Sequence, residues 1–179
     1  MRQIEVAMRV RALAAALLLV VSLPAAAQTP QPGWIADARS GCRVWNPAPQ
    51  PKEAITWSGA CQNGLAQGRG VLQWYQDNKP SERSEGEFRD GKLNGRGILI
   101  GANGDRYDGD FRDGRQNGRG AATFTNGDRY EGEWRDGNPN GVGRLARANG
   151  DVFNGIWANG CFRDGNRWAA AWVDPSTCH

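Results

Sequence analysis

Residues 105–114 are DRYDGDFRDG, and residues 128–137, 23 positions later, are DRYEGEWRDG. Seven of the ten residues are identical, and the three changes keep the charge or the aromatic ring. Repetition at a fixed period is typical of a repeat architecture, in which each unit packs against its neighbours. The question is therefore how far the period extends along the chain.

The period extends well beyond these two segments. Copies begin at Trp57, Ser84, Tyr107, Tyr130 and Phe153. The last three steps are 23 residues each, and the first step is 27 because about four residues are inserted around QDNKPSERSE. Four copies are complete, and the fifth stops after Gly160. The template is [YFW]-x-G-x-[FW]-x-x-G-x-x-x-G-x-G.

Aromatic residues and glycines occupy the fixed positions of this template. The aromatic positions hold Trp57, Phe88, Tyr107, Phe111, Tyr130, Trp134, Phe153 and Trp157. The first glycine of each copy is Gly59, Gly86, Gly109, Gly132 or Gly155, and the closing Gly-x-Gly holds Gly95 and Gly97, Gly118 and Gly120, or Gly141 and Gly143. Ser84 and Cys61 replace aromatic residues, and the last copy lacks the closing pair.

The template resembles the MORN (membrane occupation and recognition nexus) repeat over residues 57–160. The resemblance implies a scaffold or attachment module. Within each copy the residues also alternate: Tyr130, Gly132 and Trp134 fall on one face of a strand and charged residues on the other. Period two indicates half-buried strands. We therefore predict an all-β fold, an elongated twisted meander of stacked hairpins in one solenoid-like domain with disulfide-tied caps.

The glycines and the turns fit this prediction. A glycine-rich strand is weak by itself, so we expect rings from neighbouring strands to lie over the bare backbone. Asn-Gly-Asp at 103–105, 126–128 and 149–151 is expected to join the copies by short hairpin turns, because Asn and Gly tolerate positive φ. Arg-Asp-Gly at 89–91, 112–114 and 135–137 is expected to open the turn inside each copy.

The first 27 residues have the layout of a secretory signal peptide. Three arginines precede the apolar run ALAAALLLVVSL, and small residues end at Ala27, where cleavage is expected. Met1 and Met8 are both suitable starts, and an uncleaved anchor helix is the alternative. Cleavage would remove three Arg and one Glu and leave 19 basic and 18 acidic residues. An exported protein, periplasmic or secreted, is therefore expected, and near-neutral charge argues against nucleic acid.

The four cysteines lie in the exported part, which favours disulfides. We expect the pairs Cys42–Cys61 and Cys161–Cys178, and a four-cysteine zinc site is the alternative although C-x2-C spacing is absent. Residues 28–54 are expected to form a linker and an N-terminal cap, with Trp45 packing inward. Residues 161–179 are expected to form a C-terminal cap, with a final strand around 167–173. The repeat array then spans 55–160.

The sequence contains no catalytic constellation. The one histidine is His179, and no G-x-S-x-G motif occurs, so we expect no enzyme, no cofactor and no metal. A protein partner is the first expectation. Attachment to a membrane surface, a glycan stacked on the rings, and an edge-to-edge homodimer are the alternatives. The repeat aromatics are expected to be core first and the lining of a binding groove second.

Overall fold

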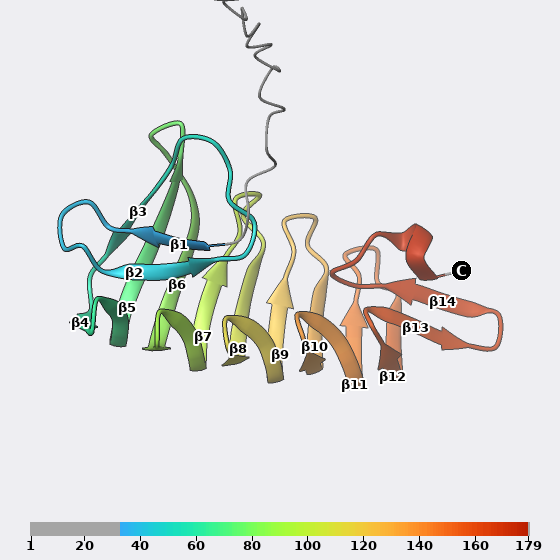
Figure 1. The fold of residues 1–179 in the computed structure, drawn as a ribbon. Helices are drawn as coiled ribbons and strands as arrows, with labels where there is room; N and C mark the ends of the chain where they lie inside the picture. The colour runs from blue at the N-terminus through green and yellow to red at the C-terminus, as the bar shows by residue number, and fades with distance from the viewer. Residues whose placement is uncertain (1–32, 179) are drawn as a thin grey trace, which may run out of the picture.

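The computed structural model describes residues 33–178, and the signal-peptide prediction lies outside them. One 14-stranded sheet contains every strand of the described residues (Figure 1). The strands are β1 (Gly33–Ala36), β2 (Arg43–Asn46), β3 (Glu53–Trp57), β4 (Ala60–Gln62), β5 (Leu65–Gln76), β6 (Lys79–Arg89), β7 (Lys92–Ile100), β8 (Arg106–Arg112), β9 (Arg115–Thr123), β10 (Arg129–Arg135), β11 (Asn138–Ala146), β12 (Val152–Ala158), β13 (Cys161–Asp164) and β14 (Arg167–Ala170). A short 3-10 helix, η1 (Pro175–Cys178), follows.

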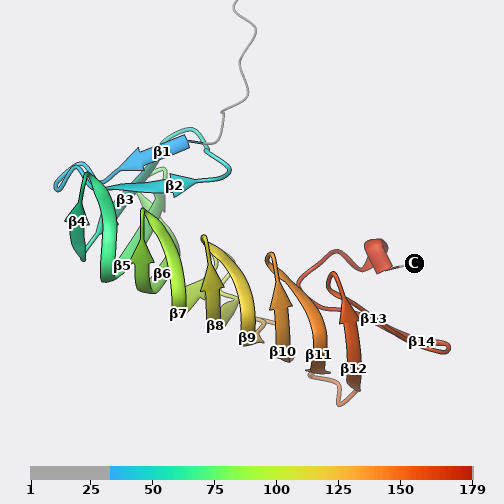
Figure 2. The same cartoon turned by 60° about the horizontal axis from the view of Figure 1, so that its bottom comes forward.

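The all-β meander predicted from the repeat is confirmed. From β5 to β12 each strand pairs antiparallel with the next. The second, third and fourth copies contribute two of these strands each, and the first and fifth copies contribute β5 and β12. The curved hairpins stack side by side into an elongated array (Figure 2). We call the face that carries the aromatic rings the inner face and the opposite face the outer face. The repeat therefore gives an array whose neighbouring units cover one another.

Rings lie over bare glycine backbone, as expected. A Cβ atom added at Gly120 would overlap the ring of Tyr107, and one added at Gly143 would overlap the ring of Tyr130. In the first copy, Trp57 covers Gly70 in the same way. The ring of each copy thus lies against the second glycine of its own closing Gly-x-Gly, so a side chain at that glycine would compete with the ring for one volume.

Two copies use cover from the facing strand: the copy that begins with Ser84, and the last copy, which begins with Phe153. Where Ser84 stands, Leu93 from the facing strand fills the space: a Cβ added at Gly86 would lie 2.9 Å from Leu93 Cδ1. In the last copy, Phe162 takes the equivalent position, and a Cβ at Gly155 would lie 3.0 Å from its ring. The cover of the glycines can therefore come from either strand of a hairpin.

The rings also link successive copies. Tyr107 packs edge-on against Trp134 of the next copy with centroids 4.8 Å apart, and Tyr130 packs against Trp157 at 5.1 Å. The indole N–H of Trp134 donates to the carbonyl oxygen of Gly120 at 3.1 Å. Burial raises the pKa of the Tyr107 and Tyr130 hydroxyls, with nearby carboxylates adding to the shift, so both stay protonated. Each hydroxyl has a backbone carbonyl as acceptor.

The first glycine of each closing pair has a different role from the one expected. A Cβ at Gly95 would meet nothing within 4 Å, and those at Gly118 and Gly141 would meet carboxylate side chains instead of rings. These glycines have φ of 68°, 117° and 106° and lie where the strand register shifts by a bulge. The register shifts by two residues at the bulge, and the first glycine of the pair lies within it, so the expectation that rings lie over the glycines is wrong for this position.

Both turns lie where they were expected, but the two-residue hairpin turn is the Asp-Gly turn inside each copy and not the Asn-Gly turn between copies. Asp90 and Gly91 have φ of 50° and 73°, and Asp-Gly recurs with positive φ at 113–114 and 136–137, so these are two-residue hairpin turns. The Asn-Gly segments instead lie in five-residue loops such as 101–105, in which only the glycine has positive φ. There Asn103 acts through its side chain, whose oxygen accepts from Asp105 N–H at 3.1 Å.

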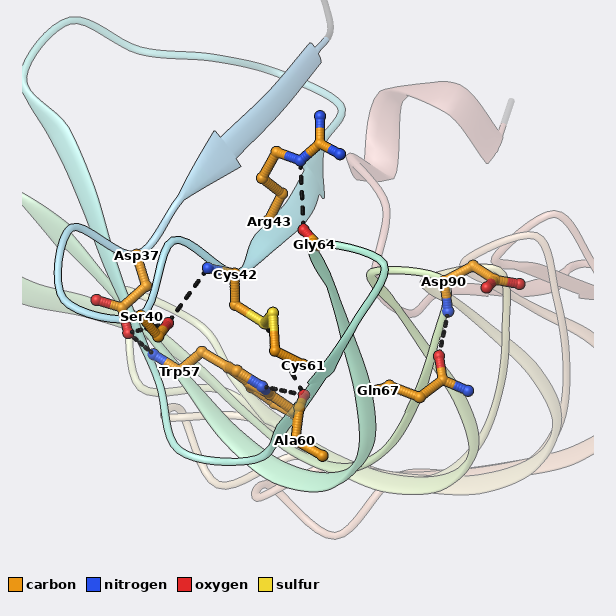
Figure 3. Close-up of a disulfide and its surroundings, with 10 residues drawn as sticks. All are labelled: Asp37, Ser40, Cys42, Arg43, Trp57, Ala60, Cys61, Gly64, Gln67 and Asp90. Carbon is orange, nitrogen blue, oxygen red and sulfur yellow. Dashed lines mark hydrogen bonds between the residues drawn. A yellow bond between two sulfur atoms is a disulfide. The ribbon is translucent and has the colours of Figure 1, made fainter.

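The N-terminal cap lies across the first two turns of the array. The β1–β2 hairpin is anchored by two backbone bonds, from Arg43 N–H to Gly64 O and from Trp45 N–H to Gly91 O, each 3.0 Å long. The disulfide Cys42–Cys61 ties the cap to the first copy, as predicted (Figure 3). The inward orientation expected for Trp45 is wrong: Val44 is buried, while Trp45 is partly exposed and packs against Trp34.

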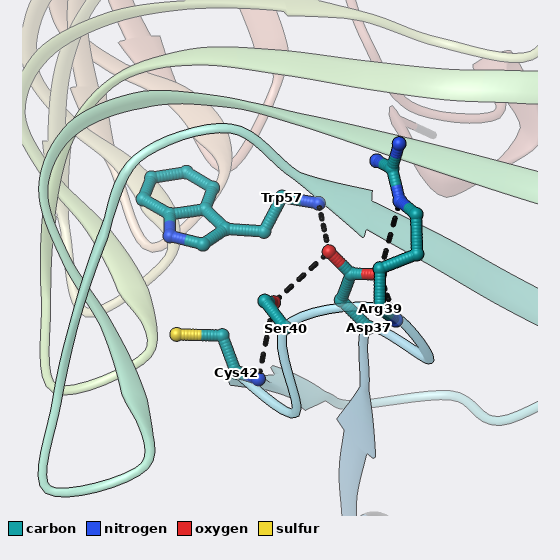
Figure 4. Close-up of polar contacts among 5 residues, drawn as sticks. All are labelled: Asp37, Arg39, Ser40, Cys42 and Trp57. Atoms are coloured by element: carbon teal, nitrogen blue, oxygen red, sulfur yellow. Dashed lines mark hydrogen bonds and ion pairs between the residues drawn. The ribbon is translucent and has the colours of Figure 1, made fainter.

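A buried carboxylate holds the loop of this cap. Asp37 is 2 % exposed and accepts hydrogen bonds from Arg39 N–H, the Ser40 hydroxyl and Trp57 N–H (Figure 4). Burial alone would raise the pKa of Asp37, but these donors outweigh it and the pKa lies below its usual range. Asp37 thus joins the cap to β3.

The C-terminal cap is pinned by the predicted disulfide Cys161–Cys178. The final strand expected around 167–173 is shorter, because β14 ends at Ala170 and Trp172 has φ of 66°. In that conformation the Trp172 ring packs against Phe124 and Trp134, with centroids 5.6 and 5.5 Å away. The end of the chain therefore folds back onto the inner face of earlier copies.

Gly120→Ala should destabilise the protein by about 2–3 kcal/mol, because the new methyl group displaces the Tyr107 ring from a packed site. The matched control is Gly95→Ala, which has open space and only a backbone cost of about 1 kcal/mol. Urea unfolding measures both changes. Equal losses would show that ring cover does not explain the recurrence of glycine at the Gly120 position.

Asp37→Asn should reduce stability at neutral pH and have little effect in acid. The folded-state pKa is lowered, so the stability contributed by the ionised carboxylate is present above the unfolded pKa of about 3.9 and is lost as pH falls through the folded pKa. Thermal unfolding of both proteins at a series of pH values measures the difference. A difference that persists unchanged at the acid end would contradict the assignment to ionised Asp37.

Candidate functional site

The repeat aromatics do not form an open groove. All eight are buried, with exposed fractions between 0 % for Tyr107 and 7 % for Phe153. The rings pack on one another, on the glycine backbone and under the two caps. These residues therefore act as core in the described structure, and the repeated surface left to solvent is the outer face.

The outer face carries a shallow trough that extends from the second to the fifth copy. Its volume is about 610 Å³, and its floor includes the backbone of Gly120, Gly132 and Gly143. Absent side chains at these glycines make the hollow, while longer side chains from neighbouring rows form its walls. The walls hold Arg96, Asp108, Arg119, Ala121, Glu131, Glu133, Val142, Arg144 and Asn154. Three arginines and three carboxylates give these walls a balanced formal charge.

One row of acids forms ion pairs along its own strand. Arg106 Nη2 lies 2.8 Å from Asp108 Oδ2, and the equivalent pair Arg129–Glu131 is 3.8 Å apart. The side chains are 41–73 % exposed, so each pair contributes at most about 1 kcal/mol. Such pairs are typical of a solvated face.

A second row of acids supports the bulges. Asp110 Oδ2 accepts from Arg119 N–H at 3.0 Å, and Glu133 Oε2 accepts from Val142 N–H at 2.9 Å. The bulge leaves these N–H groups without a strand partner, and the carboxylate supplies one. Arg119 lies directly opposite Glu133 in the strand register, yet that carboxylate bonds the bulge instead. The guanidinium groups of Arg96 and Arg119 therefore have no ion pair within the described residues.

A third repeated position was missed by the sequence analysis. A carboxamide precedes the closing Gly-x-Gly of every complete copy, namely Gln67, Asn94, Asn117 and Asn140. Each bonds the turn of the next copy; for example, Asn94 Oδ1 accepts from Asp113 N–H at 3.2 Å, and Asn140 Nδ2 donates to Asn159 Oδ1 at 3.0 Å. Its strict recurrence in the repeat was the signal that could have identified it.

The chemistry of the described residues is that of a binding surface. Residues 33–178 contain no group of three or more His, Cys, Asp or Glu side chains placed to hold a metal ion. Among the same residues, no helix is long and apolar enough to cross a membrane. The trough exposes guanidinium groups, carboxylates and the backbone of three glycines, and these groups can bind a polar surface.

Comparison with known families agrees with the structure. A family model described as MORN repeat matches residues 62–79, 85–106, 107–129 and 130–152. The chain belongs to the MORN repeat family. Two of the matched segments begin at Tyr107 and Tyr130, the first residues of the third and fourth copies. MORN repeats are in general modules for protein or membrane interaction and are not typically catalytic. No curated protein matches the chain.

Glu133→Ala should destabilise this MORN array by about 1–2 kcal/mol, because the N–H of Val142 at the bulge loses its acceptor. Glu131→Ala, two residues earlier on the same face, is the matched control and should change stability by no more than about 0.5 kcal/mol. Chemical unfolding of the two variants measures the difference. A control that costs as much as Glu133→Ala would argue against a special role of the bulge carboxylate.

Proposed function

We propose that this MORN protein is exported and holds a protein partner in the cell envelope as a non-catalytic scaffold, with the outer trough as its contact surface. The observation that carries the proposal is the division between the two faces: every repeat aromatic is buried, whereas Arg96 and Arg119 face the trough without an ion pair in the described residues. Guanidinium groups in this state are available for carboxylates and carbonyl groups of a partner.

Export is supported by two independent features. The N-terminal 27 residues have the charged, apolar and small-residue order of a signal peptide. All four cysteines are disulfide-bonded, and such bonds persist in oxidising compartments. The proposed location is therefore the periplasm or the cell exterior after cleavage near Ala27.

The alternative functions have less support. Anionic lipid attracts concentrated positive charge, whereas the trough alternates arginines with an equal number of carboxylates. A glycan would need exposed rings for stacking, and the repeat rings are covered. A protein surface of mixed charge matches the trough best, because each sign then meets its opposite.

The test is photo-cross-linking in intact cells with a photoreactive amino acid at Ala121, which lines the trough, or at Asn126, in an exposed loop. We expect one discrete protein adduct from position 121 and none from position 126. Arg96→Glu with Arg119→Glu should abolish the adduct, while Arg112→Glu, a control arginine outside the trough, should leave it intact.

Two results would contradict the proposal. One is an identical set of adducts at both positions, or none at either. The other is sedimentation of the purified protein with vesicles of anionic phospholipid at low salt together with loss of the adduct, which would favour membrane attachment.

A further inference from the structure

The outer face changes character at its last pair of strands. In the earlier copies a basic residue lies opposite an acid across the strands, in the pairs Arg69 with Glu87, Arg96 with Asp110 and Arg119 with Glu133. At the same repeat positions in β11 and β12 the pair is Val142 with Ile156. These side chains are 58 % and 67 % exposed. Exposed apolar residues where the repeat places charges indicate a surface that is covered in the working protein.

Most of β12 has a strand neighbour on one side only. β13 pairs with β12 only at Trp157 and Ala158, because the last copy lacks the Gly-x-Gly that forms the bulge and returns the strand to the ladder in other copies. The β13–β14 hairpin then leaves the array (Figures 1 and 2). Residues 152–156 therefore have a strand partner on one side only, in β11. An edge of this kind is a template for another strand, and the Arg167 guanidinium must leave the Val152 carbonyl oxygen before residue 152 can pair.

The outward residues of this edge are arranged symmetrically. Val152, Asn154 and Ile156 alternate with buried or partly buried residues along β12, so all three lie on the outer face. Val152 is 37 % exposed, and its carbonyl oxygen accepts from Arg167 Nη2 at 2.8 Å. An apolar residue thus lies two positions on either side of a central amide.

We propose that two copies of this chain pair antiparallel through residues 152–156 of β12, with Asn154 of each copy opposite Asn154 of the other. In this register Val152 of one copy faces Ile156 of the second, twice, and the central amides face each other. Val142 of each copy extends the apolar surface on the neighbouring strand. A two-fold axis through the central pair requires this self-complementarity, which an unrelated peptide would not.

The symmetry of the contact explains why pairing stops at two copies. An antiparallel contact about a two-fold axis uses the same edge of both copies, so it closes as a dimer and does not continue as a filament. At the opposite end of the array the β1–β2 hairpin covers the first copies, and Trp57 N–H of β3 donates to Asp37. The contact is small, with five residues of β12 from each copy, so the pairing should be weak and depend on protein concentration.

Sedimentation velocity of the exported, disulfide-bonded protein at concentrations from about 5 to 500 µM tests the proposal. The double variant Val142→Arg with Ile156→Glu restores the charge pair that other copies carry, so the fold tolerates it. We expect monomer–dimer equilibrium for the unchanged protein and monomer at every concentration for the variant. Ile98→Arg, a charge on the same face in an earlier copy, should still dimerise.

Asn154→Asp tests the register independently. It places two carboxylates together on the axis, so dimerisation should weaken at least tenfold at neutral pH and recover below the pKa of the aspartate pair. Unchanged circular dichroism and melting temperature of both variants would show that folding is intact. A monomer at all concentrations for the unchanged protein overturns the proposal, as does a dimer that survives Val142→Arg with Ile156→Glu.

Discussion

The structure depends on the contact between a bulky side chain and glycine backbone. A single-layer sheet has no second layer to bury its apolar face, and each hairpin here is too small to form a core. Tyr107 over Gly120 and Tyr130 over Gly143 solve this by bringing the ring down to the main chain, so that the sheet covers itself. The indole and phenol groups then bond to backbone carbonyls, and the polar parts of these rings are satisfied as well.

This arrangement also decides where binding can take place. Because the repeat aromatics are buried in the core, the outer face is the repeated surface that a partner can contact. Its acids are divided between ion pairs along a strand, as at Asp108, and bulge contacts, as at Glu133. Such a division keeps the face near neutrality while leaving guanidinium groups in the trough. Selectivity for a partner would then come from the pattern of charges more than from their sum.

Much of this could be predicted from the repeat alone, because period two and period 23 report the strand face and the stacking directly. The ring-over-glycine contact was of this kind, whereas the disulfide pairing was predicted from the positions of the four cysteines in the chain. The errors have a common cause, which is that local backbone geometry is set by tertiary pairing. The bulge places Gly118 away from the rings. Asn103 forms a side-chain hydrogen bond and does not adopt positive φ. In β2 the buried residue is Val44, and Trp45 is partly exposed. The trough could not be foreseen, since it needs the curvature that brings rows from several copies together.

The exchange between Ser84 and Leu93 has a consequence for how such arrays change over time. The side chain that covers the glycines can come from either strand of a hairpin. A strand from one copy therefore cannot replace the equivalent strand of another copy without loss of that cover. A recombination joining the first strand of the Ser84 copy to the second strand of the Tyr107 copy, which has Gln116 at the Leu93 position, would leave the glycines bare. Joining whole hairpins at the Asn-Gly loops would keep each set of glycines with the side chain that covers it.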